Sequence, residues 1–228
     1  MEMTNSVILR PVQARDFDVL SRIMFDTWYA DESVNETNVS QFKQMARFDV
    51  AHYLETSTHA MVAVQKDEHQ LSANDGADEE TVLGVAMWRN DSDWFHGTTQ
   101  KHLADDELKH AYKRQEEDHE FATMLDEFLA DAQRTIELSK KAADQSEAEL
   151  RLFMMDESAR GKGVGKKLLS YAEKSMKDSG AQQYYLYTDS TCDYGFYDYI
   201  GMTRTAEAFN VPGPSGEPLD KFIYTGTL

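Results

Sequence analysis

The chain has a single cysteine, Cys192, among its 228 residues. One cysteine cannot form an internal disulfide, and it cannot build a cysteine cage for zinc. No stretch approaches the roughly 18 consecutive apolar residues of a membrane-spanning helix, so we expect no membrane span. The first ten residues lack a basic stretch followed by an apolar core, so we expect no secretory signal. These absences favour a cytoplasmic location.

Basic residues are also scarce, since 23 Lys and Arg stand against 41 Asp and Glu and give a net charge of −18. A surface this negative repels phosphate backbones, so we expect no nucleic-acid partner. The charge could favour a cationic substrate, although such acidity also serves solubility alone. The seven histidines show no H-E-x-x-H or other ligand spacing, and none lies near Cys192. We therefore expect neither a metal site nor a cysteine nucleophile.

The spacing of apolar residues predicts a mixed α/β chain. We expect strands over 7–11, 60–64, 81–89, 150–155, 183–188, 202–209 and 220–225, and helices over 14–29, 38–56, 164–179 and 193–200. A polar connector over 67–80 contains Asn74-Asp75-Gly76, a turn signal that indicates a hairpin. There is no internal repeat, so we expect one domain over residues 1–228 with layered α/β architecture.

Residues 91–147 differ from the rest of the chain. They contain 15 acidic and 7 basic residues, a net charge of −8, and their apolar residues follow a helical pattern. Two helices are expected, each with one apolar face. The segment is short, so we interpret it as an acidic helical insertion or lid between strands and not as a second domain.

A loop rich in glycine and basic residues joins the strand over 150–155 to the helix over 164–179; it reads Arg160-Gly161-Lys162-Gly163-Val164-Gly165-Lys166-Lys167. Glycines let the backbone turn sharply and let a ligand approach the amides without a Cβ in the way. The first turn of a helix has unpaired N–H groups and a partial positive charge. The loop is therefore suited to bind a phosphate or pyrophosphate.

Three classes of glycine loop compete for this segment. A nucleotide-triphosphate loop, G-x-x-x-x-G-K-[ST], would need a glycine where Arg160 stands. A dinucleotide fingerprint, G-x-G-x-x-G, would need its third glycine at Lys166. The pattern R/Q-x-x-G-x-G/A matches fully at Arg160, Gly163 and Gly165. A glycine turn that merely caps a helix is the structural alternative.

About 30 residues further on, the chain reads Tyr194-Gly195-Phe196-Tyr197-Asp198-Tyr199-Ile200-Gly201-Met202. Together with the glycine loop, this segment resembles the two signatures of the GCN5-related N-acetyltransferase (GNAT) superfamily. The resemblance covers most of the chain except 91–147. It implies an α/β fold with a mixed, mostly antiparallel central sheet flanked by helices, with 91–147 as a helical insertion.

The resemblance implies acetyl-CoA as co-substrate, held between the strand that ends at Met155 and the strand over 183–188. The amides near Met154 and Met155 would polarise the thioester carbonyl. Asp193, or a hydroxyl just before it, stands where the family often has an asparagine that contacts the pantetheine. The pyrophosphate would lie on the amides of Arg160, Gly161, Lys162, Gly163, Val164, Gly165 and Lys166. One departure is Asp156-Glu157 in place of the usual proline, because two acids beside a pyrophosphate are unfavourable unless they point away.

The resemblance also implies two catalytic residues, Tyr197 as general acid and Glu149 as base. In the family a primary amine attacks the thioester directly, without a covalent enzyme intermediate. An amine like that of lysine has a pKa of about 10, so it must lose a proton before or during attack. A phenol can protonate the leaving thiolate late in the reaction, and position then matters more than acidity.

We therefore expect an N-acetyltransferase that acts on a small-molecule or peptide amine. We hypothesise that the acidic segment 91–147 covers the acceptor site and attracts a cationic substrate. Two alternatives stay open: a non-catalytic module that binds acyl-CoA as a sensor or regulator, and an acyltransferase with another acyl-CoA or an O-acceptor. A homodimer is also open, because exposed final strands in this fold often pair.

Overall fold

The computed structural model describes residues 7–30, 34–66, 80–92, 101–213 and 217–228. Within these residues one seven-stranded sheet has the order β1-β2-β3-β4-β5-β7-β6. The strands are β1 Val7–Pro11, β2 His59–Lys66, β3 Glu80–Asn90, β4 Ala148–Met155, β5 Gln183–Asp189, β6 Thr203–Pro212 and β7 Pro218–Thr227. The helices are α1 Phe17–Met24, α2 Val39–Thr56, α3 Asp105–Glu117, α4 His119–Ala143, α5 Val164–Asp178 and α6 Gly195–Tyr199.

Neighbouring strands are antiparallel throughout, except for the parallel pair β4 and β5. This confirms the expected mixed, mostly antiparallel sheet. β4 pairs with β5 only from Ala148 to Leu150, although β4 continues to Met155. The two strands therefore part halfway along β4.

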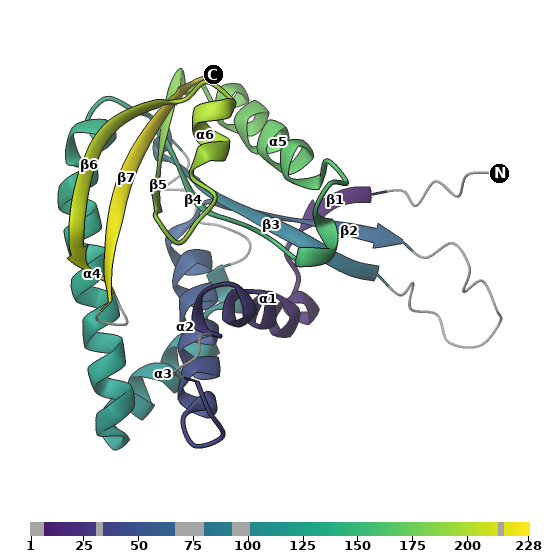
Figure 1. Cartoon of the computed structure of the whole chain (residues 1–228). Helices are drawn as coiled ribbons and strands as arrows, with labels where there is room; N and C mark the ends of the chain where they lie inside the picture. Colours follow the sequence, from purple (N-terminus) through teal and green to yellow (C-terminus); the bar gives the residue numbers. More distant parts are fainter. Residues whose placement is uncertain (1–6, 31–33, 67–79, 93–100, 214–216) are drawn as a thin grey trace, which may run out of the picture.

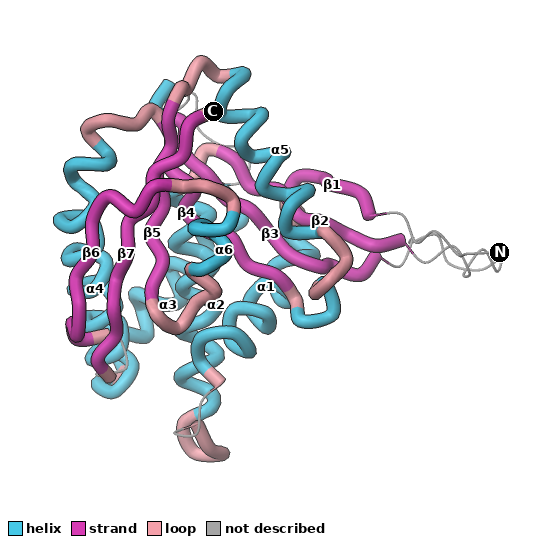
Figure 2. Tube along the Cα trace, turned by 45° about the horizontal axis from the view of Figure 1, so that its top comes forward, coloured by secondary structure: helices cyan, strands magenta, loops and turns pink. Residues whose placement is uncertain are grey.

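Helices cover both faces of the sheet (Figures 1 and 2). α5 and α6 lie on one face, where Val164, Leu168 and Tyr197 join a core beneath them. α1, α2, α3 and α4 lie on the other face, and their buried residues form a second core. Each helix has an apolar stripe with helical spacing, which explains this two-faced packing.

A β-bulge at Arg151 divides β4 between the two cores. Leu152 pairs with Met87 and Leu150 pairs with Trp88, so Arg151 is an extra residue opposite β3. Leu150 consequently packs in the core under α5, whereas Leu152 packs in the core under α2. The bulge lies where β4 leaves β5, so it determines which side chains face the opening.

The helical segment between β3 and β4 is integrated into the fold. α3 packs on α2, and α4 runs along β5, β6 and β7. Phe121 and Leu125 of α4 are fully buried in the core under α2. Lys221 of β7, 2% exposed, places its Nζ 2.6 Å from Oδ1 of Asp131 in α4. α4 is thus packed firmly against the sheet and the core under α2. The assignment of the whole chain to one domain stays a prediction.

One detail differs from the sequence prediction, and another is not described. The helix expected over 14–29 is divided into a 3₁₀ turn Ala14–Asp16, then α1, then a π-helical turn Phe25–Tyr29. A π turn widens a helix and re-aims its side chains. The turn expected at Asn74-Asp75-Gly76 lies outside the described residues.

Candidate active site

The glycine loop has the geometry of an anion site. Gly161 and Gly163 adopt left-handed backbone angles, φ 73° and 71°, which favour glycine. The first hydrogen bond of α5 runs from the Lys167 amide to the Gly163 carbonyl. Among the described residues, the amides of Val164, Gly165 and Lys166 therefore have no backbone acceptor. A Cβ at Gly161 or Gly163 would meet no atom within 4 Å, so the space beside the loop is open.

Basic side chains surround this loop, and they differ in what they bind. Arg160 pairs with Glu157, and both side chains are largely exposed. Lys162 and Lys166 are exposed as well. Lys167 is engaged elsewhere, because its ammonium donates to the Val7 carbonyl of β1. Three cations of the loop are thus placed where they could turn toward a bound anion.

Asp156, the first acid of the departure from the family pattern, points away from the loop. Its carboxylate accepts from the Ser158 amide at 2.9 Å and from Arg22 of α1 at 2.8 Å. Burial alone raises the pKa of Asp156, but the bonds from Ser158 and Arg22 outweigh it and hold that pKa below its usual range. A carboxylate neutralised in this way does not oppose a phosphate on the loop.

The loop adjoins the end of β4. A Cβ at Gly165 would lie 3.5 Å from the Phe153 ring and 3.8 Å from the Met155 sulfur. Met155 also lies over Gly84 of β3, where a Cβ would come within 2.5 Å of its methyl group. Met154 is different, because its side chain is buried in the opposite core. Met154 is predicted to contact the thioester, and from this position it could do so only with its backbone.

Tyr197 lies on the same face of the sheet, in α6. Its ring is 8% exposed and packs against Phe196 and Tyr224. Phe196 in turn stacks on Phe153 of β4, with ring centroids 6.2 Å apart. Burial, and then the neighbouring Cys192, raise the pKa of Tyr197 above its ordinary value. The phenol thus holds its proton beside the end of β4.

Asp193 precedes α6 and is exposed. Its carbonyl accepts from the Phe196 amide at 3.1 Å, and its side chain is not the cap of α6, whose N-cap residue is Tyr194. The structure therefore leaves this carboxylate near Tyr197 but without a bond that fixes it to the described loop.

Glu149, the predicted base, lies on the other face of the sheet. Its Oε2 is 3.1 Å from Arg89 Nη2 and 3.0 Å from Arg151 Nη1. Arg151 also donates to Oε1 at 3.1 Å. The structure thus brings the glycine loop, Met155 and Tyr197 to one face, and it places Glu149 at the start of β4 between two guanidinium groups.

Sequence reasoning missed an acid on the buried face of α2. Asp49 lies on the same stripe as Met45 and Tyr53 and is 7% exposed. It is four residues from each of them, which is the helical spacing of neighbours. A carboxylate in an otherwise apolar stripe is the signal that could have found it.

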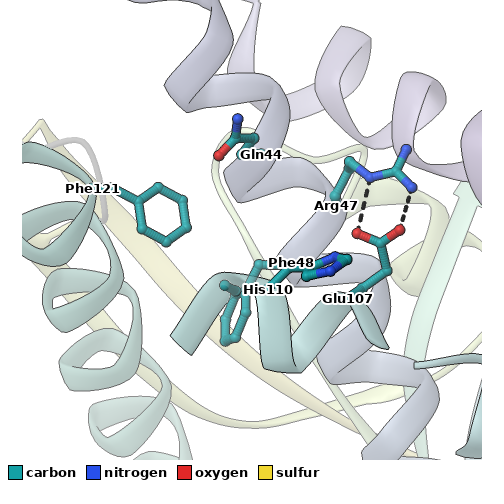
Figure 3. Close-up of a pocket in the computed structure, with 7 residues that line it drawn as sticks. Gln44, Arg47, Phe48, Glu107, His110 and Phe121 are labelled. Atoms are coloured by element: carbon teal, nitrogen blue, oxygen red, sulfur yellow. Dashed lines mark hydrogen bonds and ion pairs between the residues drawn. The ribbon is translucent and has the colours of Figure 1, made fainter. Parts of the chain in front are cut away.

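The structure has one cavity beside the glycine loop and another away from it. One of about 420 Å³ begins at Lys166 and extends between α5, α6 and the strands β5 and β7. Its lining includes Ser170, Glu173, Tyr184, Phe196, Tyr199 and Thr225. The other, of about 270 Å³, lies among α2, α3 and α4, away from the loop (Figure 3). There Arg47 is already paired with Glu107 and with Asp18, so we do not place the reaction in it.

Within the described ranges, no group of three or more His, Cys, Asp and Glu residues could hold a metal ion. No helix in the same ranges is both long and apolar enough to span a membrane.

A sheet that opens between β4 and β5, beside a phosphate-type glycine loop, is the arrangement that the resemblance predicts. The family model described as the acetyltransferase (GNAT) family matches residues 40–201. This match covers more than half of the chain. The protein therefore belongs to the acetyltransferase (GNAT) family, and the expected family is confirmed.

Solved structures show the same fold at low sequence identity. A GCN5-related N-acetyltransferase from Rhodopseudomonas palustris has a TM-score of 0.53 and 14% identity, with 100% of both chains covered. A mosquito arylalkylamine N-acetyltransferase like 5b has a TM-score of 0.51 and 16% identity, with 98% of this chain and 100% of the other covered. A putative phosphinothricin N-acetyltransferase has a TM-score of 0.51 and 16% identity, with 98% of this chain and 99% of the other covered. No curated protein matches the chain.

Proposed function

We propose that the protein transfers an acetyl group from acetyl-CoA to a primary amine by direct attack. Family membership supports acyl transfer from an acyl-CoA. The observation that carries the proposal is the loop: the amides at the start of α5 have no backbone acceptor among the described residues, and open space lies beside Gly161 and Gly163.

The residues present fit coenzyme A. The amides of Arg160 and Lys162 already donate to the Glu157 and Ala159 carbonyls, so the predicted set of amides is reduced. A pyrophosphate on the amides at the start of α5 would face its partial positive end, with the Arg160, Lys162 and Lys166 side chains close by. The cavity of about 420 Å³ continues from Lys166 along α5 and has the size of a ligand site. We assign it to the nucleotide end of the coenzyme. The thioester would then reach the opening between β4 and β5.

Two steps of the proposed reaction would use groups of this chain. The amine nitrogen bonds to the acetyl carbon, and the resulting oxyanion would be stabilised by a backbone amide near Met155. The carbon–sulfur bond then breaks. Tyr197, whose pKa is raised by burial, keeps its proton until the thiolate forms and then donates it to the sulfur.

The acceptor is proposed to be a small-molecule or peptide amine that carries positive charge. The net charge of −18 and the charge of −8 over 91–147 support a cation. Glu149 remains the base predicted from the sequence. A base must take up a proton, and protonating Glu149 would weaken its ion pairs with Arg89 and Arg151. The role of Glu149 as base is tested separately by Glu149→Gln.

The proposal is tested by thiol release from acetyl-CoA across a panel of amines, with calorimetry of CoA binding in parallel. Gly163→Val should abolish CoA binding, because its side chain would project into the space assigned to the diphosphate. Valine is also strained at φ 71°. Gly180→Val is the matched control, since Gly180 has φ 95°, open surroundings and a position at the far end of α5. Retained CoA affinity in a folded Gly163→Val would contradict the placement.

A further inference from the structure

Asp49 is a buried carboxylate with no cationic partner among the residues that the structure describes. Its Oδ2 accepts a hydrogen bond from the Tyr29 hydroxyl at 3.3 Å. Its Oδ1 is buried and has no hydrogen-bond partner among the described residues. No Lys, Arg or His of the described chain forms an ion pair with it. A buried acid of this kind costs stability, so a use for it is expected.

The two tyrosines beside Asp49 lead from it toward the sheet. Tyr29 belongs to the π turn Phe25–Tyr29, and Tyr53 lies one helical turn beyond Asp49 on α2. Burial, and then the charge of Asp49, raise the pKa of Tyr53, while Arg151 acts in the opposite direction. Both tyrosine residues are partly exposed, whereas the acid behind them is buried.

This cluster continues to the opening between β4 and β5. The Arg151 guanidinium lies 5.9 Å from the centre of the Tyr53 ring, and Arg151 is the bulge residue where β4 leaves β5. Burial, and to a smaller degree the neighbouring Cys192, raises the pKa of both Tyr53 and Tyr197, so Cys192 lies near both phenols. Asp49 is therefore linked by successive neighbours to the phenol proposed to protonate the thiolate.

Two other buried or half-buried acids near the opening are already engaged. Glu149 is bound by Arg89 and Arg151, and Asp131 is bound by Lys221. Burial raises the pKa of Asp49 to about 7, with the Tyr29 bond opposing it. An acid with such a pKa is half ionised at neutral pH, which suits a general base. The titratable groups that face it are Tyr29 from the π turn and Tyr53 from α2, and Glu149 and Arg151 of β4 act on Tyr53.

We propose that Asp49, acting through the Tyr29 hydroxyl, accepts the proton that a cationic acceptor amine must lose before it attacks the thioester. This inference rests on the function proposed above and names the base for it.

The protons balance along this route. The ammonium gives one proton to the Tyr29 oxygen while the Tyr29 proton moves to Asp49 Oδ2. The neutral amine then forms the C–N bond and the C–S bond breaks. The sulfur takes the Tyr197 proton, and the second proton leaving the nitrogen restores Tyr197 through solvent. The proton on Asp49 returns to solvent, so the net products are the amide, the free thiol of CoA and one proton.

The test compares pH profiles of kcat/KM with the amine that gives the fastest thiol release in the panel. The wild type should show a rise with an apparent pKa near 7. Asp49→Asn should lose that rise and fall in kcat by about 10²-fold, with CoA affinity kept within about twofold. Asp49→Glu should restore part of the rate. Asp178→Asn, an exposed acid on α5 paired with Lys174, is the control for charge and should keep the wild-type profile.

A second readout separates a proton acceptor from a structural acid. A β-fluorinated analogue of the same amine is less basic, so Asp49→Asn should lose much less activity with it than with the parent amine. If Asp49→Asn does not fold, Tyr29→Phe tests the proposal instead. This variant removes the relaying hydroxyl and leaves the Asp49 carboxylate in place. Its kcat should fall as much as the kcat expected for Asp49→Asn.

Two outcomes overturn different claims. A wild-type pH profile and rate in Asp49→Asn or Tyr29→Phe would refute the role of Asp49 and leave the acetyltransferase proposal intact. Wild-type protein that binds CoA but releases no thiol with any amine would refute the proposed function itself.

Discussion

Removing the hydroxyl of Tyr197 leaves its ring between Phe196 and Tyr224. Tyr197→Phe should therefore fold as the wild type does and bind CoA within about twofold of it. Its kcat should fall by about 10²-fold, because the departing thiolate loses its proton donor. Steady-state thiol release and calorimetry measure the two quantities.

The matched control is Tyr171→Phe, a partly exposed tyrosine on α5 that contacts Trp88 outside the proposed site. An unchanged kcat in Tyr197→Phe would remove this phenol from the mechanism. Lost turnover with retained CoA binding would also exclude a purely sensory role, since a sensor has no turnover to lose.

Asp49 also predicts how stability depends on pH. Its pKa rises from 3.8 to about 7 on folding, so the native state binds more protons than the unfolded state between these values. Stability from this group is therefore lost as pH rises from about 4 to 7. Asp49→Asn should match the wild type near pH 4 and exceed it at pH 8, by roughly 4 kcal/mol at most. Urea denaturation at both pH values checks this, and a difference that does not change with pH contradicts it.

The backbone geometry of the glycine loop could be predicted because it is determined locally. Gly161 and Gly163 need no distant partner to turn the backbone, and the helix after them supplies the amides. The apolar stripe of α2 could have pointed to Asp49, but its surroundings could not be predicted in this way. They depend on the lack of a cation among the described residues and on Tyr29, which binds Asp49 from a segment 20 residues away.

At the level of elements, the order of strands and helices followed from apolar periodicity, but two irregularities did not. Leu150 and Leu152 alternate as if they shared one face, and the bulge at Arg151 separates them. The bulge depends on pairing with β3, which the spacing within one strand does not encode. The π turn Phe25–Tyr29 could not be predicted either, because it packs against α2 and this packing is not encoded in the local spacing.

The contact between β7 and α4 should contribute strongly to stability. Lys221 Nζ binds Asp131 Oδ1 at 2.6 Å and Thr135 Oγ1 at 2.7 Å in a buried position. Lys221→Met should cost about 3–5 kcal/mol of unfolding free energy, since it leaves a largely buried carboxylate with Arg134 as its remaining cation.

The exposed pair Lys174–Asp178 provides the comparison for this measurement. Lys174→Met should cost less than about 1 kcal/mol in the same urea denaturation experiment. Equal losses in Lys221→Met and Lys174→Met would mean that the buried pair does not hold α4 to the sheet.

Over the whole molecule, charge is unevenly distributed. The chain carries −18, residues 91–147 carry −8, and residues 156–180 carry six basic against four acidic residues. The net charge would therefore repel the proposed anionic coenzyme, which only the loop attracts locally, and would attract the proposed cationic acceptor. The two substrates should respond to salt in opposite directions, because salt screens repulsion and attraction alike.

This asymmetry of charge can be tested with salt. Raising ionic strength from about 0.01 to 0.15 M shortens the screening length from about 30 to 8 Å. KM for a dicationic amine should rise with salt, more than KM for a monocation, while CoA affinity should not fall in parallel. Neutralising exposed acids of α3 and α4 at Asp106, Glu116 and Glu127 should raise the acceptor KM at low salt and flatten its salt dependence. The same number of changes at Glu36, Glu55 and Asp178, outside the insertion, controls for net charge; equal effects of both variants would show that the total charge, and not the insertion, attracts the amine.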